Sequence, residues 1–133
     1  MEISIPAIIG AVSNMVVGFL WYGPLLGKSW MKLVGISKAG VDSAKGKMPM
    51  IYGLTFLGAL VEAHVLSYLI NKMNIVSVVD GAWLGFWVGL GLVATTMLAN
   101  YLYTNKPRNL YLIDMGYHLV ALVLMGALIT YLS

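Results

Sequence analysis

Long runs of apolar residues dominate the chain, and short polar stretches separate them. Four such runs cover approximately residues 5–26, 50–70, 78–103 and 110–132. Each approaches or exceeds the roughly 20 residues that an α-helix needs to cross a hydrocarbon core about 30 Å thick. The runs are apolar on every face, whereas a barrel strand needs about 10 residues of alternating polarity. The pattern therefore predicts an all-α integral membrane protein, a bundle of four transmembrane helices.

Helix-breaking residues stand at the ends of these runs. Gly23 and Pro24 lie near the end of the first run, Pro49 lies at the start of the second, and residues 105–108 (NKPR) separate the third from the fourth. No stretch is left over for a soluble domain. We therefore expect residues 1–133 to form a single four-helix transmembrane domain.

The composition agrees with lipid as the surrounding solvent. Of the 133 residues, 60% are hydrophobic and 10% are charged, whereas soluble domains average roughly 25% charged residues. The net charge of +3 is too small to indicate a nucleic-acid partner. Cysteine is absent, which excludes disulfides and thiolate metal sites. The expected partner of the chain is the lipid bilayer.

The basic residues indicate how the chain is oriented. Of the eight Lys and Arg residues, five fall in the first connection, one in the second and two in the third. The positive-inside rule then places connections 27–49 and 104–109 on the cytoplasmic side of the cell (inner) membrane, with both termini outside. A cleaved signal peptide is the competing interpretation of the first run, but that run lacks a basic leading segment.

The first connection begins with an amphipathic stretch that contains Lys28, Trp30 and Lys32. On a short helix these side chains separate into a basic face and an apolar face, a pattern typical of segments that lie in the headgroup layer. We interpret the stretch as an interfacial segment that sets topology and anchors the chain. Binding of an anionic lipid or a protein partner is the alternative interpretation.

Three strings resemble a known family. Residues 21–30 read WYGPLLGKSW, residues 100–103 read NYLY and residues 112–120 read LIDMGYHLV. They resemble the membrane proteins known as domain of unknown function 1761, and the resemblance covers nearly the whole chain. It implies four spans in a bacterial or fungal membrane and supplies no accepted reaction or ligand. The family commonly has Asn in place of Asp114 and an apolar residue in place of Glu62, so it assigns neither acid a role.

Ionisable residues inside the predicted spans are the candidates for chemistry. Each costs about 2.5–3.5 kcal/mol on insertion scales, so each needs a partner or a function. The predicted spans contain Glu62, His64, Asp114 and His118. Glu62 lies near mid-membrane, level with Asn14. Their contact would be a hydrogen bond that stabilises the packing of two helices. The alternative is a proton or cation site in which a histidine acts as relay.

A second polar layer is expected in the cytoplasmic third of the spans, where Asp114, Asn100 and Tyr22 lie at similar depth. Asp114 can pair with His118 at i and i+4, but we favour a structural contact of Asp114 with Asn100 or Tyr22. We expect no metal, because catalytic zinc usually needs three protein ligands. We expect no haem either, because His64 and His118 lie at different depths.

Glycines on two predicted helices point to close packing. Gly81, Gly85 and Gly89 form one stripe on the third helix, and Gly10 and Gly18 lie on a similar stripe of the first. Small residues at this spacing let helix backbones approach closely in lipid. We therefore predict that the first and third helices pack tightly, either with each other or across a subunit boundary.

The leading functional hypothesis is transport or permeation linked to protons or cations. The polar path would contain Glu62, His64 and the Asp114–His118 pair. Four short helices leave little room for a pore within one subunit, so a homo-oligomer is expected. The alternative is an accessory or scaffolding subunit that binds other membrane proteins. A membrane enzyme acting on lipid or quinone is a third hypothesis, although hydrolase, nucleotide-binding and zinc-protease motifs are absent.

Overall fold

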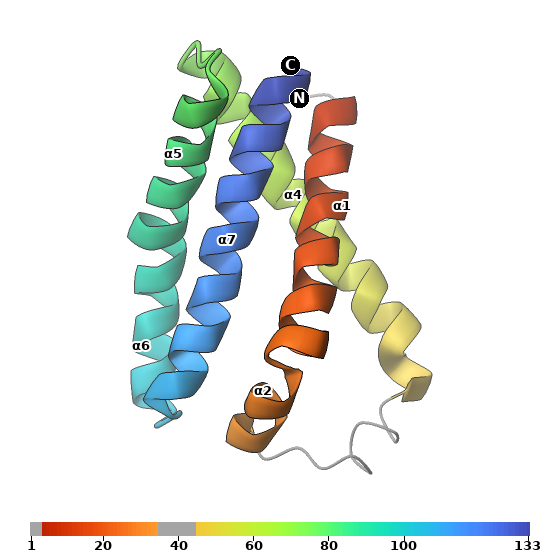
Figure 1. The fold of residues 1–133 in the computed structure, drawn as a ribbon, viewed down its shortest axis with the longest axis vertical. Helices are drawn as coiled ribbons and strands as arrows, with labels where there is room; N and C mark the ends of the chain where they lie inside the picture. The colour runs from red at the N-terminus through yellow and green to blue at the C-terminus, as the bar shows by residue number, and fades with distance from the viewer. Residues whose placement is uncertain (1–3, 35–44) are drawn as a thin grey trace.

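The computed structural model describes residues 4–34 and 45–133, and nearly all of these residues are helical. Figure 1 shows both termini at one end of the molecule. In chain order the elements are α1 (Ile5–Leu20), the π-helix η1 (Trp21–Leu25), α2 (Gly27–Val34), the 3-10 turn η2 (Lys45–Lys47), α4 (Met48–Lys72), α5 (Val78–Val88), the π-helix η3 (Gly89–Ala94), α6 (Thr95–Tyr103) and α7 (Arg108–Leu132).

Four helical segments are long and apolar enough to cross a membrane, namely Ile5–Leu25, Met48–Lys72, Val78–Tyr103 and Arg108–Leu132. They run alternately in opposite directions, so α2 and the turn from α6 to α7 lie at the end opposite the start of α1 and the end of α7 (Figure 1). The predicted all-α architecture with four long apolar helices is therefore confirmed for the described residues. Residues 35–44, which belong to the predicted basic connection, lie outside them.

Local sequence signals account for several helix ends. Ser4 caps α1 by accepting a hydrogen bond from the Ala7 N–H at 3.3 Å. Pro49 occupies the first turn of α4, where a missing N–H costs nothing. The chain leaves α4 and α6 through Asn74 and Asn105, whose φ angles are 55° and 56°. This left-handed conformation lets the following amides bond back to the helix end.

Gly23 and Pro24 do not end the first long helix. They lie inside η1, whose wider turn accommodates the proline. The Leu26 N–H reaches back five residues to the Trp21 carbonyl oxygen at 2.9 Å. A second π-helix, η3, interrupts the third span. Such turns are frequent at functional sites, and sequence reasoning anticipated neither of them.

α7 is the central helix, with α5 on one side and α1 on the other (Figure 1). A Cβ atom added at Gly85 would overlap the Leu122 carbonyl oxygen, and one added at Gly81 would lie 2.6 Å from the Gly126 carbonyl oxygen. Gly10 of α1 also faces α7. The prediction that the first and third helices pack against each other is wrong within the chain, because α7 lies between them. Gly126 of α7 allows the close approach to α5.

The apolar core fills the half of the molecule that carries the termini. Its buried side chains come from α1, α4 and α7: Ala7, Ala11, Ala59, Ala63, Leu66, Ile70, Leu122, Met125 and Ile129. α4 crosses the other helices at an angle, and its first half diverges from them toward the opposite end (Figure 1). Gly53 and Gly58 in that half have open space beside them. We call the half that contains this core the closed half, and the half in which α4 diverges from the other helices the open half.

Candidate functional site

Glu62 of α4 and Asn14 of α1 meet near the border between the closed and the open half. Asn14 Nδ2 donates a hydrogen bond to Glu62 Oε2 at 3.1 Å. Asn14 is buried, with 6% of its surface exposed. The contact expected from the common depth of the two residues is therefore present, and it joins α1 to α4.

Tyr117 of α7 extends this pair to a third helix. Its hydroxyl donates to Asn14 Oδ1, so the Asn14 amide joins a carboxyl group on one side to a phenol on the other. A Cβ atom added at Gly18 would lie 3.4 Å from the Tyr117 hydroxyl oxygen, so glycine leaves room for the ring. Sequence reasoning missed Tyr117. Its position three residues after Asp114, close to the same helix face, is the signal that could have found it.

Asp114 of α7 is held by tyrosines from two other elements. The Tyr22 hydroxyl of η1 donates to Asp114 Oδ1 at 2.5 Å, and the Tyr101 hydroxyl of α6 donates to Oδ2. The expected contact with Tyr22 is therefore present. Asn100 is exposed, and Tyr101 takes the place expected for it, because successive side chains on a helix point about 100° apart.

η1 directs two consecutive aromatic side chains at α7. Trp21 Nε1 donates to the Ile113 carbonyl oxygen at 2.9 Å, while the next residue, Tyr22, reaches Asp114. Gly116 makes room for the indole, because a Cβ atom there would lie 3.0 Å from Trp21 Cζ2. The π-turn therefore docks the end of the first span on α7 and supplies one of the two donors to the carboxylate.

A cavity of about 740 Å³ opens beside these groups, with lining residues from α1, η1, α2, α4, α6 and α7. Asp114, Tyr22 and Tyr117 border it, together with His118. Six of its lining side chains are aromatic, and none of the described residues that line it is Lys or Arg. Mostly apolar cavities of roughly 300–1,000 Å³ with a few polar groups are typical small-molecule sites.

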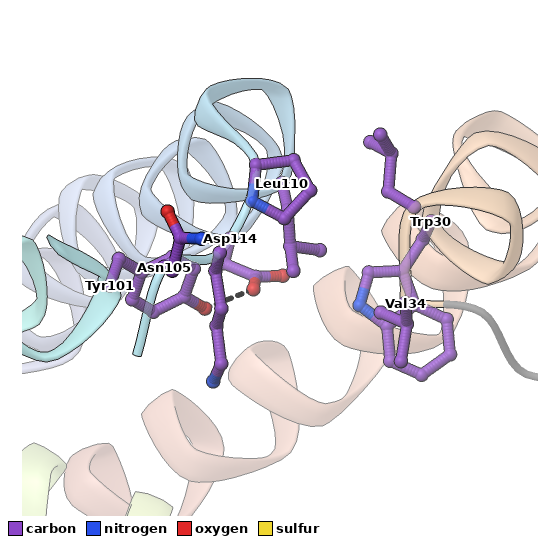
Figure 2. Close-up of a pocket in the computed structure, with 9 residues that line it drawn as sticks. Trp30, Val34, Tyr101, Asn105, Leu110 and Asp114 are labelled. Carbon is purple, nitrogen blue, oxygen red and sulfur yellow. Dashed lines mark hydrogen bonds between the residues drawn. The ribbon is translucent and has the colours of Figure 1, made fainter. Parts of the chain in front are cut away.

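A smaller pocket of about 370 Å³ lies between α2 and the turn from α6 to α7. Figure 2 shows Asp114 and Tyr101 on one side of it, with Trp30 and Val34 of α2 facing them. Asp114, Tyr101 and Trp30 also line the large cavity, so they are shared by both spaces. Lys106 lines the smaller pocket, where its Nζ lies 4.7 Å from the centre of the Tyr101 ring.

α2 contains the three residues of the predicted interfacial segment. Lys28 and Lys32 are exposed, whereas Trp30 is half-buried. The Trp30 ring packs edge-to-face on Tyr22, with 5.4 Å between the ring centroids. Trp30 therefore contributes to the wall of the site, a role that the sequence pattern did not indicate.

Glu62 also borders a groove of about 200 Å³ that α4 forms with α5, η3 and α7. The remaining residues that line this groove are apolar: Val61, Val65, Leu66, Leu69, Val88, Val93 and Leu122. The Glu62 carboxyl group is thus bonded to Asn14 on one side and borders an apolar groove on the other.

The histidines make no hydrogen bond to these acids within the described ranges 4–34 and 45–133. His118 lies against Tyr117, with 4.8 Å between the ring centroids. The direct pair with Asp114 that the i, i+4 spacing allows is not among the hydrogen bonds of these ranges, where both Asp114 oxygens accept hydrogen bonds from tyrosines. His64 is half-buried and lines none of the three pockets. No group of three or more His, Cys, Asp and Glu side chains in those ranges could hold a metal ion.

Comparison with known proteins identifies a family. The model of a family described as Protein of unknown function (DUF1761) matches residues 5–130, a range that includes every residue of the site. No curated protein and no solved structure matches the chain. The description of the family names no activity.

Proposed function

The chain belongs to the family described as Protein of unknown function (DUF1761), and from its site we propose that it is a small membrane transport protein. The large cavity is its cargo site, and Glu62 is the group that links transport to protons or cations. One observation carries this proposal. The Asn14 side chain donates a hydrogen bond from its nitrogen to Glu62, which borders the groove, and its oxygen accepts one from Tyr117, which borders the cavity. Asn14 therefore connects the groove to the cavity.

The charge on Glu62 controls the orientation of Asn14. An ionised carboxylate only accepts hydrogen bonds, so it keeps the amide NH₂ group turned toward itself, whereas a neutral acid can donate to the amide oxygen. That oxygen is the acceptor of the Tyr117 hydroxyl. A protonated Glu62 carboxyl group therefore competes with the Tyr117 hydroxyl for the side-chain oxygen of Asn14. Because an amide relays protons poorly, the link transmits a conformational change to the cavity rather than the proton itself.

The four apolar helices support a multi-pass arrangement in the cell membrane. By the positive-inside rule, the first and third connections lie in the cytoplasm and both termini lie outside. The cavity then opens in the cytoplasmic half of the bilayer, while the apolar core closes the outer half. A site that is open to one side and closed to the other is one of the two states that alternating access requires.

A homo-oligomer is part of this proposal. The groove beside Glu62 lies on the surface that α4 and α5 share, where Val61 and Val65 are exposed. A second copy placed against this surface would cover the Glu62 carboxyl group. It would also complete a polar path that four helices are too few to enclose, and closed symmetry is the usual arrangement for such copies.

Flux in proteoliposomes tests the proposal. Vesicles loaded with a pH-sensitive dye report proton movement under an imposed potential, with and without Na⁺ or K⁺ gradients. We expect Glu62→Gln to lose most of the flux, because Gln keeps the shape and an acceptor for Asn14 but cannot ionise. The matched control is Asp80→Asn, an acid-to-amide change at an exposed position in the first turn of α5, which should keep native flux.

The outcomes separate the functional hypotheses. If the native protein assembles well but gives no flux above that of empty vesicles, transport of protons, alone or linked to Na⁺ or K⁺, is rejected. An accessory or scaffolding role toward other membrane proteins is then favoured. If Glu62→Gln carries native flux, transport stands and Glu62 is not its coupling group.

A further inference from the structure

The large cavity contains an acid, and none of the described residues that line it is Lys or Arg. Asp114 is the one acid among the described residues that line it. Both of its oxygens accept hydrogen bonds from tyrosine hydroxyls, which is the arrangement of an ionised carboxylate. Lys106 makes no ion pair with Asp114 within the described ranges, and it lies over the Tyr101 ring in the smaller pocket.

Aromatic rings form the wall beside this carboxylate. The ring centroid of Tyr22 lies 5.4 Å from that of Trp30 and 5.4 Å from that of Tyr117, and both pairs pack edge-to-face. Phe19 and Tyr52 make a third edge-to-face pair where α1 and α4 border the cavity. The faces of such rings attract cations that are held away from water.

The remaining walls suit a bulky apolar group. Three methionines, Met15, Met48 and Met97, line the cavity, and their unbranched, polarisable side chains adapt to ligands of different shape. The volume of about 740 Å³ is sufficient for a drug-sized molecule. The first half of α4 diverges from α1 (Figure 1), and Tyr52 is 45% exposed there. A molecule dissolved in the lipid can therefore approach the cavity from the side.

We infer that this cavity binds an amphipathic organic cation, in which an ammonium or phosphonium centre is attached to an apolar body. The inference rests on the proposed function in that the cation would be the transported cargo. A small hydrated metal ion fits less well, because apolar walls do not replace its hydration shell. Among the described lining residues, an anionic ligand would meet Asp114 and no lysine or arginine.

Two probes of the same shape and opposite charge test the inference. Tetraphenylphosphonium is the cation and tetraphenylborate is the anion. Equilibrium dialysis of the purified full-length protein in detergent, with empty micelles as blank, measures the saturable binding of each. We expect saturable binding of tetraphenylphosphonium and none of tetraphenylborate. Equal binding of the two probes, or no saturable binding of the cation, overturns the inference.

Substitutions locate the binding in the cavity. We expect Asp114→Asn to weaken tetraphenylphosphonium binding about tenfold or more, as for the loss of a charged partner. Native affinity in a folded Asp114→Asn protein overturns the inference. Because Asp114 also holds two tyrosines, that variant can fail to fold, and a second pair of variants is needed.

Tyr52→Leu and Tyr68→Leu form this matched pair. Both tyrosines belong to α4 and they are 45% and 46% exposed, but Tyr52 lines the cavity and Tyr68 does not. We expect Tyr52→Leu to weaken phosphonium binding about threefold to tenfold through lost cation–π attraction, and Tyr68→Leu to have no effect. Equal effects of the two substitutions overturn the inference.

The cation site and the transport function fail in different experiments. Proton flux that requires Glu62, together with no phosphonium binding, overturns the cation site and leaves transport standing. Phosphonium binding that depends on Asp114 or Tyr52, without any flux, supports the cation site and rejects transport of the ions tested.

Discussion

The hydroxyl of Tyr117 donates a hydrogen bond to the side-chain oxygen of Asn14, which lies 103 residues earlier in the chain. Asn14 in turn donates to Glu62, so α1, α4 and α7 share one hydrogen-bonded link. The link lies between the half of the molecule that contains the apolar core and the half that contains the large cavity. A change at Glu62 can therefore reach the cavity through two hydrogen bonds.

Tyr117→Phe removes this link and keeps the ring. We expect the free energy of unfolding to fall by about 1 kcal/mol, because Asn14 loses a partner in a buried position. We also expect Glu62-dependent flux in proteoliposomes to fall strongly. The control is Tyr131→Phe on the same helix, where the side chain is 74% exposed. Denaturant unfolding followed by tryptophan fluorescence measures stability, and native flux from folded Tyr117→Phe would contradict the proposed coupling.

Gly85→Ala tests the close approach of α5 to α7. The added Cβ atom would overlap the Leu122 carbonyl oxygen, and backbone cannot move aside as a flexible side chain can. We expect a loss of about 1–3 kcal/mol in stability, read as a lower melting temperature by circular dichroism. Gly58→Ala has open space, so it should be neutral or stabilise by up to about 1 kcal/mol. Equal melting temperatures of the two variants would contradict the close approach of α5 to α7.

Asn105→Ala tests the left-handed residue after α6. Its φ angle of 56° places a Cβ atom in an unfavourable position that Asn tolerates better than Ala does. We expect Asn105→Ala to lower the unfolding free energy by about 1 kcal/mol, and Asn105→Gly to leave it unchanged or raise it slightly. Asn109→Ala, exposed in the first turn of α7, is the control. Chemical denaturation of all three variants gives the comparison.

Single cysteines test the orientation, and the absence of native cysteine makes the labelling specific. Ser133→Cys marks the C-terminal end, and Asn109→Cys marks the third connection with its basic residues. Because basic connections remain in the cytoplasm, a membrane-impermeant maleimide should label Ser133→Cys in intact cells. It should label Asn109→Cys only after lysis. The opposite labelling pattern would mean that the chain is inverted.

Depth along a span was enough to anticipate two contacts of the site. Glu62 and Asn14 lie near the middle of their spans, and Tyr22 and Asp114 lie near one end, so each pair could meet. Depth does not give the rotation of a helix about its axis, and for this reason Tyr101 was not distinguished from Asn100. Rotation depends on which neighbour each face packs against, and that is a property of the assembled bundle.

The sequence by itself determined the number and type of the long helices, because a run of about 20 apolar residues has one stable arrangement in lipid wherever its neighbours lie. Only the tertiary structure decided that α7 is central, that α1 and α5 pack on its two sides, and that the π-turn at Trp21–Leu25 carries Tyr22 to Asp114. These choices depend on carbonyl oxygens, glycines and hydroxyls meeting at short range across the bundle. In a chain with so few polar groups, each of these contacts decides where the cavity forms and what it can bind.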